Sequence, residues 1–368
     1  MKKFFVTTIV ALSIAFLASC SGGKLCKING TLVEEGADGS KVYLYNYATS
    51  ELLDSTTLND SHFAFAGEYG NDVVLYINTE ARYYGFCIAE AGEISIDLNT
   101  DAVSGTPMND KLGEYNNSLH SALKDKEEAL EALTMKAREM DQSDTVAMRQ
   151  IFNEYETISK EIEGINKDLT TKLYESNKNN ALGAFAFTRM LDSYTSFAEL
   201  DAAVAQVNPA IAKYKAVQTQ LEILRNIDAT AVGKHYTDVN GLAMGSHDAI
   251  TLSQLIDGKV AIVDFWASWC GPCRQEIKEN LVPLYAKYAS QGLQVVGLDI
   301  SDKFEEHAKA VENLGITYPQ LIDTTRVAAT TYGVNSIPEI MLINKEGIIV
   351  ARGLRGNAIE EAIKKALK

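Results

Sequence analysis

The stretch VDFWASWCGPCRQEI, residues 263–277, decides the fold of the last third of this 368-residue chain. It joins a compact apolar run, 260–265, to a helical pattern that continues to Tyr288. An apolar run of this kind is typical of a strand buried between two layers of helices. The two cysteines of the stretch, Cys270 and Cys273, are therefore expected where a buried strand ends and a helix begins.

The sequence around this stretch alternates strand and helix signals. A second apolar run at 293–298 precedes a helical pattern at 304–314, and two strand signals within 339–351 flank a turn. A last amphipathic helix is expected at 357–368. The pattern predicts an α/β domain over residues 231–368, with a βαβ unit and an antiparallel hairpin.

A cysteine at the start of a helix has a particular chemistry. Unpaired backbone N–H groups and the helix dipole favour the thiolate of Cys270, and in a C-x-x-C motif such placement lowers the cysteine pKa from ~8.5 to around 7. Pro272 fits the first helical turn because no backbone donor is needed there. Cys273, one turn further on, can attack a mixed disulfide formed at Cys270 and release the product.

Three further residues make the pattern specific, namely Asp264, Trp269 and Pro338. With the two cysteines they resemble thioredoxin, and residues 232–368 resemble the TlpA/ResA family of extracytoplasmic thiol-disulfide oxidoreductases. The resemblance implies a buried Asp264 that acts as base for the resolving thiol, and a cis peptide bond before Pro338. It assigns catalysis to Cys270, Cys273 and Asp264, and substrate contacts to Trp269, Gly271, Pro272, Ile337 and Pro338.

Departures from the family pattern bear on the direction of electron flow. Many relatives carry Asn in place of Asp264, Pro in place of Gly271 and Thr in place of Glu339. Asp264 and Gly271 favour a thioredoxin-like reductant of protein disulfides, supplied with electrons by a thiol-reducing donor in the membrane. Two interpretations of Glu339 stay open: it selects a basic partner surface, or it is a solvated strand end.

The N-terminus predicts export. Lys2 and Lys3 precede an apolar run, 4–18, which is too short to span a membrane and is typical of a signal peptide over residues 1–19. The run ends in residues 17–20, Leu-Ala-Ser-Cys, which resemble the lipobox of bacterial lipoproteins. The resemblance implies acylation of Cys20 and attachment to the lipid membrane. No Asp follows Cys20, and by the same resemblance this favours the periplasmic face of the outer membrane over the inner membrane. A secreted protein with a coincidental Cys20 is the alternative.

Residues 20–105 read as short strands separated by turns, and they predict a small antiparallel sandwich or barrel. This region resembles the β-domain of unassigned function that precedes thioredoxin-like domains in many bacterial lipoproteins. The expected strands include 41–45, 61–65, 73–77 and 93–98. Cys26 and Cys87 lie at opposite ends of it, and the sequence leaves open whether they form a disulfide or stay separate buried thiols.

Residues 106–230 are expected to be helical. Apolar positions recur at spacings of three and four on both sides of a polar break at 141–144, which predicts an antiparallel helical hairpin. Ser196 and Glu199 have the spacing of a capping box, and a further helix is expected from Pro209 through Leu224. A packed bundle or spacer explains this region, and a partner-binding coiled coil is the alternative.

Composition narrows the function classes. A formal net charge of −15 disfavours nucleic acid as a partner. A zinc site would need ligands beyond the single C-x-x-C pair, and Val263 and Ala267 occupy the Pro and Thr positions of a P-x-x-x-T-x-x-C peroxidase motif. No metal or bound cofactor is therefore expected beyond the redox-active Cys270–Cys273 disulfide. The alternative function is a partner-binding or assembly lipoprotein in which the thiols are secondary.

Overall fold

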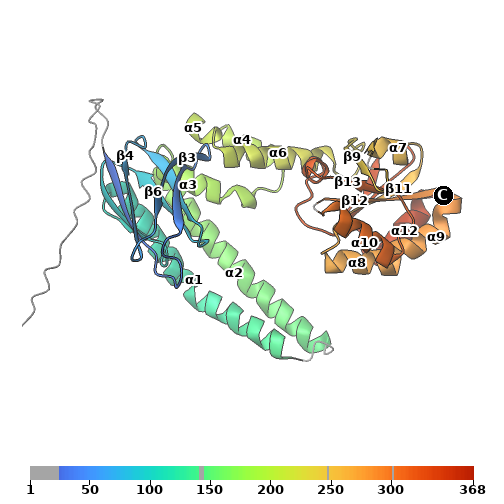
Figure 1. The fold of residues 1–368 in the computed structure, drawn as a ribbon, viewed down its shortest axis with the longest axis horizontal. Coiled ribbons are helices and arrows are strands. Elements are labelled where there is room, and N and C mark those ends of the chain that lie inside the picture. The colour runs from blue at the N-terminus through green and yellow to red at the C-terminus, as the bar shows by residue number, and fades with distance from the viewer. Residues whose placement is uncertain (1–24, 141–144, 247, 301) are drawn as a thin grey trace, which may run out of the picture. The chain divides into compact units, whose positions relative to one another are not determined.

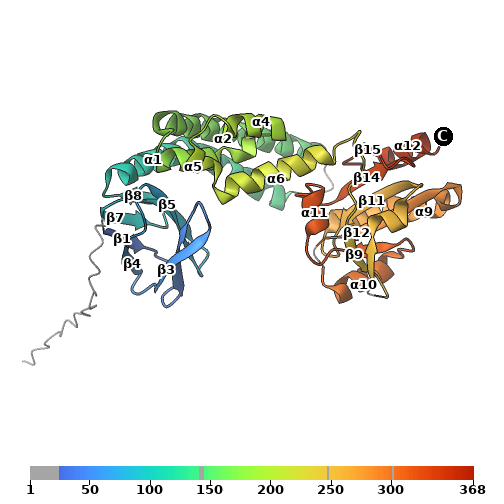
Figure 2. The same ribbon diagram turned by 90° about the horizontal axis from the view of Figure 1, so that it is seen from above.

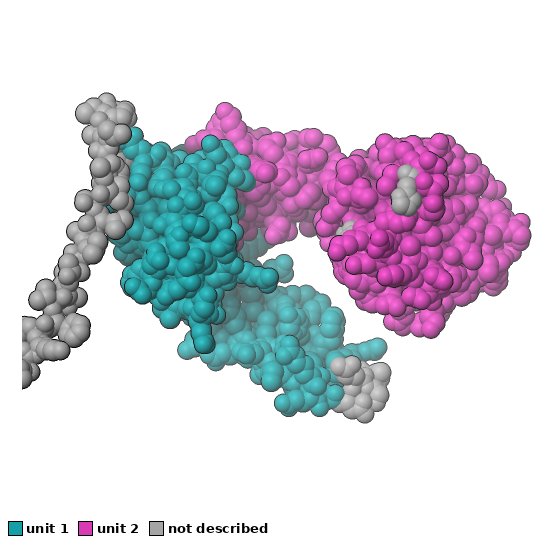
Figure 3. Space-filling model, in the orientation of Figure 1, with its two compact units in different colours: residues 1–185 teal, residues 186–368 magenta. Residues whose placement is uncertain are grey.

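The computed structural model describes residues 25–140, 145–246, 248–300 and 302–368, so the predicted signal peptide, Cys20 and the polar break at 141–144 lie outside the described residues. The chain forms two compact units, residues 1–185 and 186–368 (Figure 3). The boundary falls inside a helix of the region expected to be helical. No helix among the described residues is long and apolar enough to cross a membrane.

The first unit begins with two four-stranded sheets, which follow the strand orders β4-β1-β7-β8 and β3-β2-β5-β6 (Figures 1 and 2). The strands are β1 (Cys26–Thr31), β2 (Lys41–Asn46), β3 (Glu51–Thr57), β4 (His62–Gly67), β5 (Val73–Thr79), β6 (Tyr84–Ala89), β7 (Gly92–Asp97) and β8 (Ala102–Ser104).

Alternate residues of most of these strands are buried, so each sheet has an apolar face, as the period of two predicts. Two separate sheets correspond to the sandwich and not to the barrel. The expectation of a wholly antiparallel domain is wrong, because β1 pairs with β7 in parallel. The chain reaches that pairing after five intervening strands, and no local sequence pattern encodes a partner so distant.

The first unit continues with the predicted helical hairpin, α1 (Pro107–Glu139) and α2 (Thr145–Asn177), followed by α3 (Ala181–Arg189), which contains the boundary. Asn109 fixes the start of α1 to β6: its side-chain oxygen accepts from the Ile88 N–H at 2.8 Å, and its amide donates to the Ile88 carbonyl at 2.9 Å. Gly113, one turn further on, lets α1 approach the backbone of β8 closely, since a Cβ atom there would lie 2.1 Å from the Val103 carbonyl oxygen.

Gly113→Ala is expected to lower the free energy of unfolding by about 1–3 kcal/mol, because the added methyl group forces α1 away from β8. Gly164→Ala is the matched control: a Cβ at Gly164 in α2 meets nothing within 4 Å, so Ala should stabilise that helix by about 0.5–1 kcal/mol. Urea unfolding followed by circular dichroism measures both variants. Changes of the same sign would contradict the close approach of α1 to β8.

The second unit opens with helical segments η1 (Leu191–Ser193), α4 (Phe197–Val204), α5 (Pro209–Ala212) and α6 (Lys215–Ala229). The Ser196 hydroxyl accepts from the Glu199 N–H at 3.3 Å, which confirms the predicted start of α4. The single helix expected from Pro209 through Leu224 is wrong. The chain turns at Lys213, and Tyr214 becomes the residue that precedes α6, so two helices replace one.

A seven-stranded mixed sheet forms the core of the second unit, in the order β10-β9-β13-β12-β11-β14-β15 (Figure 1). The strands are β9 (Asn240–Ala243), β10 (Ala249–Thr251), β11 (Val260–Trp266), β12 (Leu293–Asp299), β13 (Gln320–Ile322), β14 (Glu339–Ile343) and β15 (Ile349–Ala351). The helical segments are α7 (Leu252–Ile256), α8 (Gly271–Glu276), η2 (Ile277–Leu281, a π-helical turn), α9 (Val282–Tyr288), η3 (Ala289–Gln291), α10 (Phe304–Leu314), α11 (Val327–Thr331) and α12 (Asn357–Ala366).

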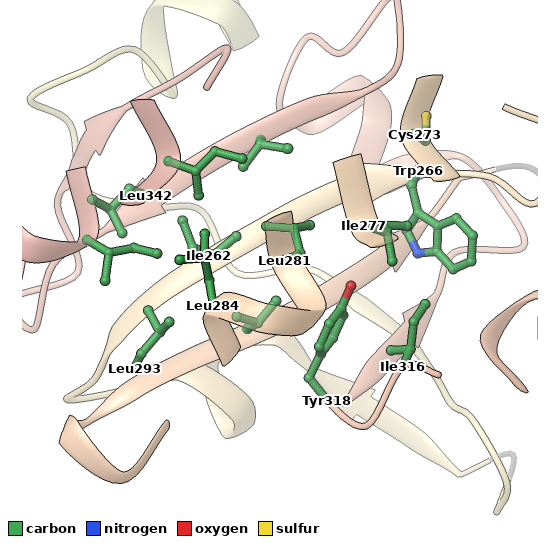
Figure 4. Close-up of a cluster of buried hydrophobic side chains, with 14 of the residues drawn as sticks. Ile262, Trp266, Cys273, Ile277, Leu281, Leu284, Leu293, Ile316, Tyr318 and Leu342 are labelled. Atoms are coloured by element: carbon green, nitrogen blue, oxygen red, sulfur yellow. The ribbon is translucent and has the colours of Figure 1, made fainter. Parts of the chain in front are cut away.

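Every residue of β11 is buried, so both faces of this strand are covered. Val260, Ile262 and Trp266 pack on the face covered by α9, α10 and α12, where Cys273 lies at one end of the cluster (Figure 4). Ala261, Val263 and Phe265 pack on the opposite face, against α7 and α11. This arrangement is a thioredoxin-type α/β fold, and it confirms the predicted βαβ unit and hairpin.

Candidate active site

The loop after β11 and the start of α8 carry the two cysteines of the motif. Cys270 and Cys273 form a disulfide with their Cα atoms 5.3 Å apart. Cys270 is the residue that precedes α8, and the Cys273 N–H donates to its sulfur at 3.2 Å. The helix therefore begins on the sulfur of Cys270, as the sequence predicts, with Pro272 in its first turn.

Both cysteines are buried, and their surroundings differ. Cys270 is 5% exposed and Cys273 is 0% exposed. Trp269, directly before Cys270, is 65% exposed, and a Cβ atom on Gly271 would meet nothing within 4 Å. The residues on either side of Cys270 are thus exposed, whereas Cys273 is enclosed by the protein.

Asp264 lies in the middle of β11, and strand alternation points it to the same face as Ile262 and Trp266, on which the active-site helix lies. It is 1% exposed, and among the described residues its Oδ2 atom has no hydrogen-bond partner. Burial raises the pKa of the Asp264 carboxyl to about 8, the Arg355 guanidinium lowers it, and the charge of Glu276 raises it. A carboxyl group with such a pKa can accept and return a proton near neutral pH.

The segment 337–338 lies at the same end of the strands as Cys270. Glu339, the first residue of β14, is the register partner of Phe265 near the end of β11, so the Ile337–Pro338 peptide lies beside the loop that carries Cys270. That peptide bond is cis, as the family resemblance implies. The geometry brings both cysteines and the 337–338 peptide to the C-terminal end of β11, and Asp264 lies within that strand, two residues before its end.

Glu339 answers the question that the sequence left open. Its carboxylate accepts from the Arg352 Nε at 3.1 Å, and both side chains are mostly buried. Arg352 also donates to the carbonyl oxygens of Thr230 and Tyr332. Glu339 thus belongs to an internal ion pair, and neither a selector of basic partners nor a solvated strand end describes it.

Two charged residues near Asp264 escaped the sequence analysis. Glu276 caps α12, since its carboxylate accepts from the Gly356 N–H at 3.1 Å and from the Asn280 amide at 2.9 Å. Arg355 donates to the carbonyl oxygens of Leu354 and Pro338. The position of Glu276, three residues after Cys273 on one helix, was a usable signal. Arg355 comes near Asp264 only through the fold.

A second group missed by the sequence analysis supports the loop before Cys270. Asp302 accepts from the Ser268 N–H at 2.6 Å and from the Ser268 hydroxyl at 2.9 Å. Its own N–H donates to Asp299 at 3.1 Å, and His307 Nδ1 lies 3.4 Å from its carboxylate. Asp299, Asp302 and His307 place potential metal-ligating atoms within 4.8 Å of one another. Because both Asp302 oxygens are engaged by Ser268, we interpret the group as a support for the active-site loop.

Asp302→Ala is expected to slow alkylation of Cys270 by iodoacetamide at pH 6 by about three- to fivefold in the reduced protein, because a loosened loop no longer holds the sulfur at the helix start. At pH 9, where the thiol is ionised in either case, the rates should converge. Asp302→Asn keeps one acceptor and should fall between. If the variant loses stability but the pH dependence of Cys270 alkylation is unchanged, the role of Asp302 is structural only.

Cys26 and Cys87 are separate buried thiols in the structure and do not form a disulfide. The sequence by itself leaves both arrangements open. Cys26 belongs to β1 and Cys87 to β6, in different sheets. Burial raises the pKa of both thiols. Neither is therefore activated as a nucleophile.

Comparisons with known proteins agree with this geometry. Residues 232–352 match the model of the AhpC/TSA family, and residues 26–112 match a domain of unknown function, DUF4369. The chain is 31% identical over 113 residues to the thiol-disulfide oxidoreductase ResA of Bacillus thuringiensis. The matched residues make up 31% of this chain and 64% of ResA. The chain thus spans less than two thirds of that relative.

Two further proteins complete the comparison. The thioredoxin domain of a thiol-disulfide oxidoreductase from Bacteroides vulgatus has a TM-score of 0.35 and 26% identity, over 38% of this chain and 99% of that domain. The thiol:disulfide interchange protein HelX of Rhodobacter capsulatus is 30% identical over 136 residues, which are 37% of this chain and 74% of HelX. Through its C-terminal domain, the chain belongs to the family of thioredoxin-fold thiol-disulfide oxidoreductases.

Proposed function

We propose that the protein reduces disulfide bonds of other proteins through the Cys270–Cys273 dithiol. The observation that carries this proposal is the pair of cysteines at the start of α8, on the face of β11 that contains the buried Asp264. The reaction begins when the thiolate of Cys270 attacks one sulfur of the substrate disulfide. A mixed disulfide forms, and the other substrate sulfur leaves as a thiolate that takes up a proton.

The second step closes the ring. Asp264 accepts the proton of the Cys273 thiol, the resulting thiolate attacks the sulfur of Cys270, and the second substrate thiol leaves. Two electrons have passed to the substrate, and Cys270 and Cys273 are joined in a disulfide. In the reverse direction a protonated Asp264 supplies the proton to Cys273. Trp269 and the Ile337–Pro338 backbone would contact the substrate segment, together with Gly271 and Pro272.

Reduction of insulin disulfides tests the activity. The fully reduced protein, supplied with dithiothreitol, should accelerate precipitation of the insulin B chain above the rate with dithiothreitol alone. Absence of any acceleration would overturn the proposal. Peroxide reduction is not proposed, although one family model is described as AhpC/TSA, because Val263 and Ala267 replace the Pro and Thr of the peroxidase motif.

The cellular setting belongs to the same proposal. Lys2 and Lys3, the apolar run after them and Cys20 support export as an acylated lipoprotein, held on the periplasmic face of the outer membrane. The oxidised Cys270–Cys273 pair would then need a thiol-reducing donor in the membrane. Labelling of the cells with palmitate tests the anchor, and label that persists in Cys20→Ser would refute it.

A further inference from the structure

A cleft of about 380 Å³ lies on the flank of the active-site helix. Gly271, the residue directly after Cys270, is part of its wall, and the other lining residues belong to α8, η2 and the last turn of α10. Among them, Leu314 supplies an apolar wall whose side chain also packs against the core. A ligand in this cleft would therefore contact Gly271, the residue that follows the nucleophilic Cys270.

Two cations line the cleft without a carboxylate partner. Arg274 and Lys278 are four residues apart on one helical face, and both are exposed. Neither takes part in a salt bridge with any described residue. The carboxylate of Glu279, which also lines the cleft, accepts from the Gln275 amide at 3.3 Å. The guanidinium and ammonium groups are thus available to a ligand.

The positive charge of Arg274 and Lys278 contrasts with the negative net charge of the protein. The whole chain has a net charge of −15, and residues 232–368 hold 14 Lys and Arg against 16 Asp and Glu. Three cations elsewhere in this unit are neutralised by carboxylates: Lys287 and Lys364 by Glu360, and Arg352 by Glu339. A locally cationic cleft beside the nucleophile attracts anions to the point of reaction.

We propose that this cleft docks an acidic, extended segment of the protein whose disulfide reacts at Cys270. Arg274 in α8 and Lys278 in the π-helical turn η2 lie about one helical turn, roughly 5 Å, apart along the axis. Side chains at positions i and i+2 of an extended segment lie on one side, ~6.6 Å apart. Acidic residues at alternate positions next to the reactive cysteine therefore match the two cations. This inference rests on the proposed function and specifies its substrate class.

Three peptides of equal length test the proposal, each with one disulfide and with Glu-Ala-Glu, Ser-Ala-Ser or Lys-Ala-Lys beside the reactive cysteine. The reduced full chain is mixed with each peptide, and the second-order rate constant is measured at low and high ionic strength. At low salt the Glu peptide should react about tenfold faster than the Ser peptide, and the Lys peptide slower than both. High salt should remove most of these differences.

Two variants locate the effect. In R274Q/K278Q the ratio of the Glu to the Ser rate constant should fall about tenfold, towards one. K259Q/K345Q removes the same charge from the opposite end of the sheet, and its ratio should match that of the unchanged protein. An equal loss in both variants would mean that net charge and not the cleft selects the peptide, which would overturn the inference.

Two outcomes separate this inference from the proposed function. Reduction of all three peptides at similar rates would refute acidic docking and leave the reductase activity established. If neither the Ser peptide nor the Glu peptide is reduced, the activity itself is refuted.

A Glu-Glu-Ala peptide tests the extended conformation of the bound segment. Its adjacent carboxylates point to opposite sides, so it should lose most of the advantage of Glu-Ala-Glu. Equal rates for the two peptides would refute an extended bound segment.

Discussion

Cys270→Ser is expected to abolish the reduction of protein disulfides, with a loss of at least about a thousandfold, because a hydroxyl group at this position cannot form the mixed disulfide. Cys273→Ser should also stop turnover but at a later stage. In that variant Cys270 still attacks, and the mixed disulfide persists because nothing resolves it. Mass spectrometry of each reduced variant after mixing with a disulfide substrate should show a one-to-one adduct for Cys273→Ser and none for Cys270→Ser.

The structural reason for this asymmetry is access. Cys270 stands at the start of α8 beside the exposed Trp269, whereas Cys273 is fully buried in the first turn. The double variant Cys270→Ser/Cys273→Ser is the control, since it retains the buried thiols Cys26 and Cys87. An adduct in that variant would assign the reaction to the β-sheet region. An adduct with Cys270→Ser alone would reverse the two roles.

Local patterns predicted those parts of the fold that local forces determine. The residues of β11 and β12 are mostly apolar on both faces of the strand, so neither face can be exposed to solvent. A central position for both strands in a sheet covered on both sides follows from this composition. The long helices α1 and α2 follow from spacings of three and four. The positions of Asp264, Cys270 and Cys273 follow from the chain itself, because they lie within ten residues of one another.

Features that depend on distant partners were beyond the sequence. Ser268 and Asp302 are 34 positions apart, and their hydrogen bonds exist only because β11 and β12 run in parallel and end together. The pairing of Glu339 with Arg352 depends likewise on the hairpin of β14 and β15, whose register shifts. The cleft between α8 and the end of α10 is a third case, because periodicity shows that Arg274 and Lys278 share a helical face but not what faces them.

Asp264→Asn is expected to change how the stability of the catalytic domain depends on pH. The carboxyl group has a pKa of about 8 in the folded protein, against an ordinary value of 3.8, because it is buried. Between these pH values the folded protein holds a proton that the unfolded chain has released, so a rise in pH favours unfolding. From pH 4 to pH 8 this costs the folded state on the order of 5 kcal/mol, and the Asp264→Asn variant, which has no proton to release there, escapes the cost.

Urea unfolding of the oxidised proteins, followed by tryptophan fluorescence, measures this effect. Both tryptophans, Trp266 and Trp269, lie in the catalytic domain, so the signal reports on that domain. The variant should become progressively more stable relative to the unchanged protein as the pH rises from 4 to 8, although its buried amide costs about 1–3 kcal/mol at every pH. Asp248→Asn, at an exposed carboxylate, is the control and should leave the pH dependence unchanged.

The same substitution should slow catalysis, because it removes the carboxyl group proposed as the base for Cys273. Without the carboxyl group nothing accepts the proton of Cys273, and release of the mixed disulfide should slow by about a hundredfold near neutral pH. The deficit should shrink as the pH rises, because hydroxide can then take the proton of Cys273 in place of Asp264. A variant that is stabilised but resolves the mixed disulfide at the unchanged rate would separate the two effects, and it would show that the burial of Asp264 has no part in the chemistry of Cys273.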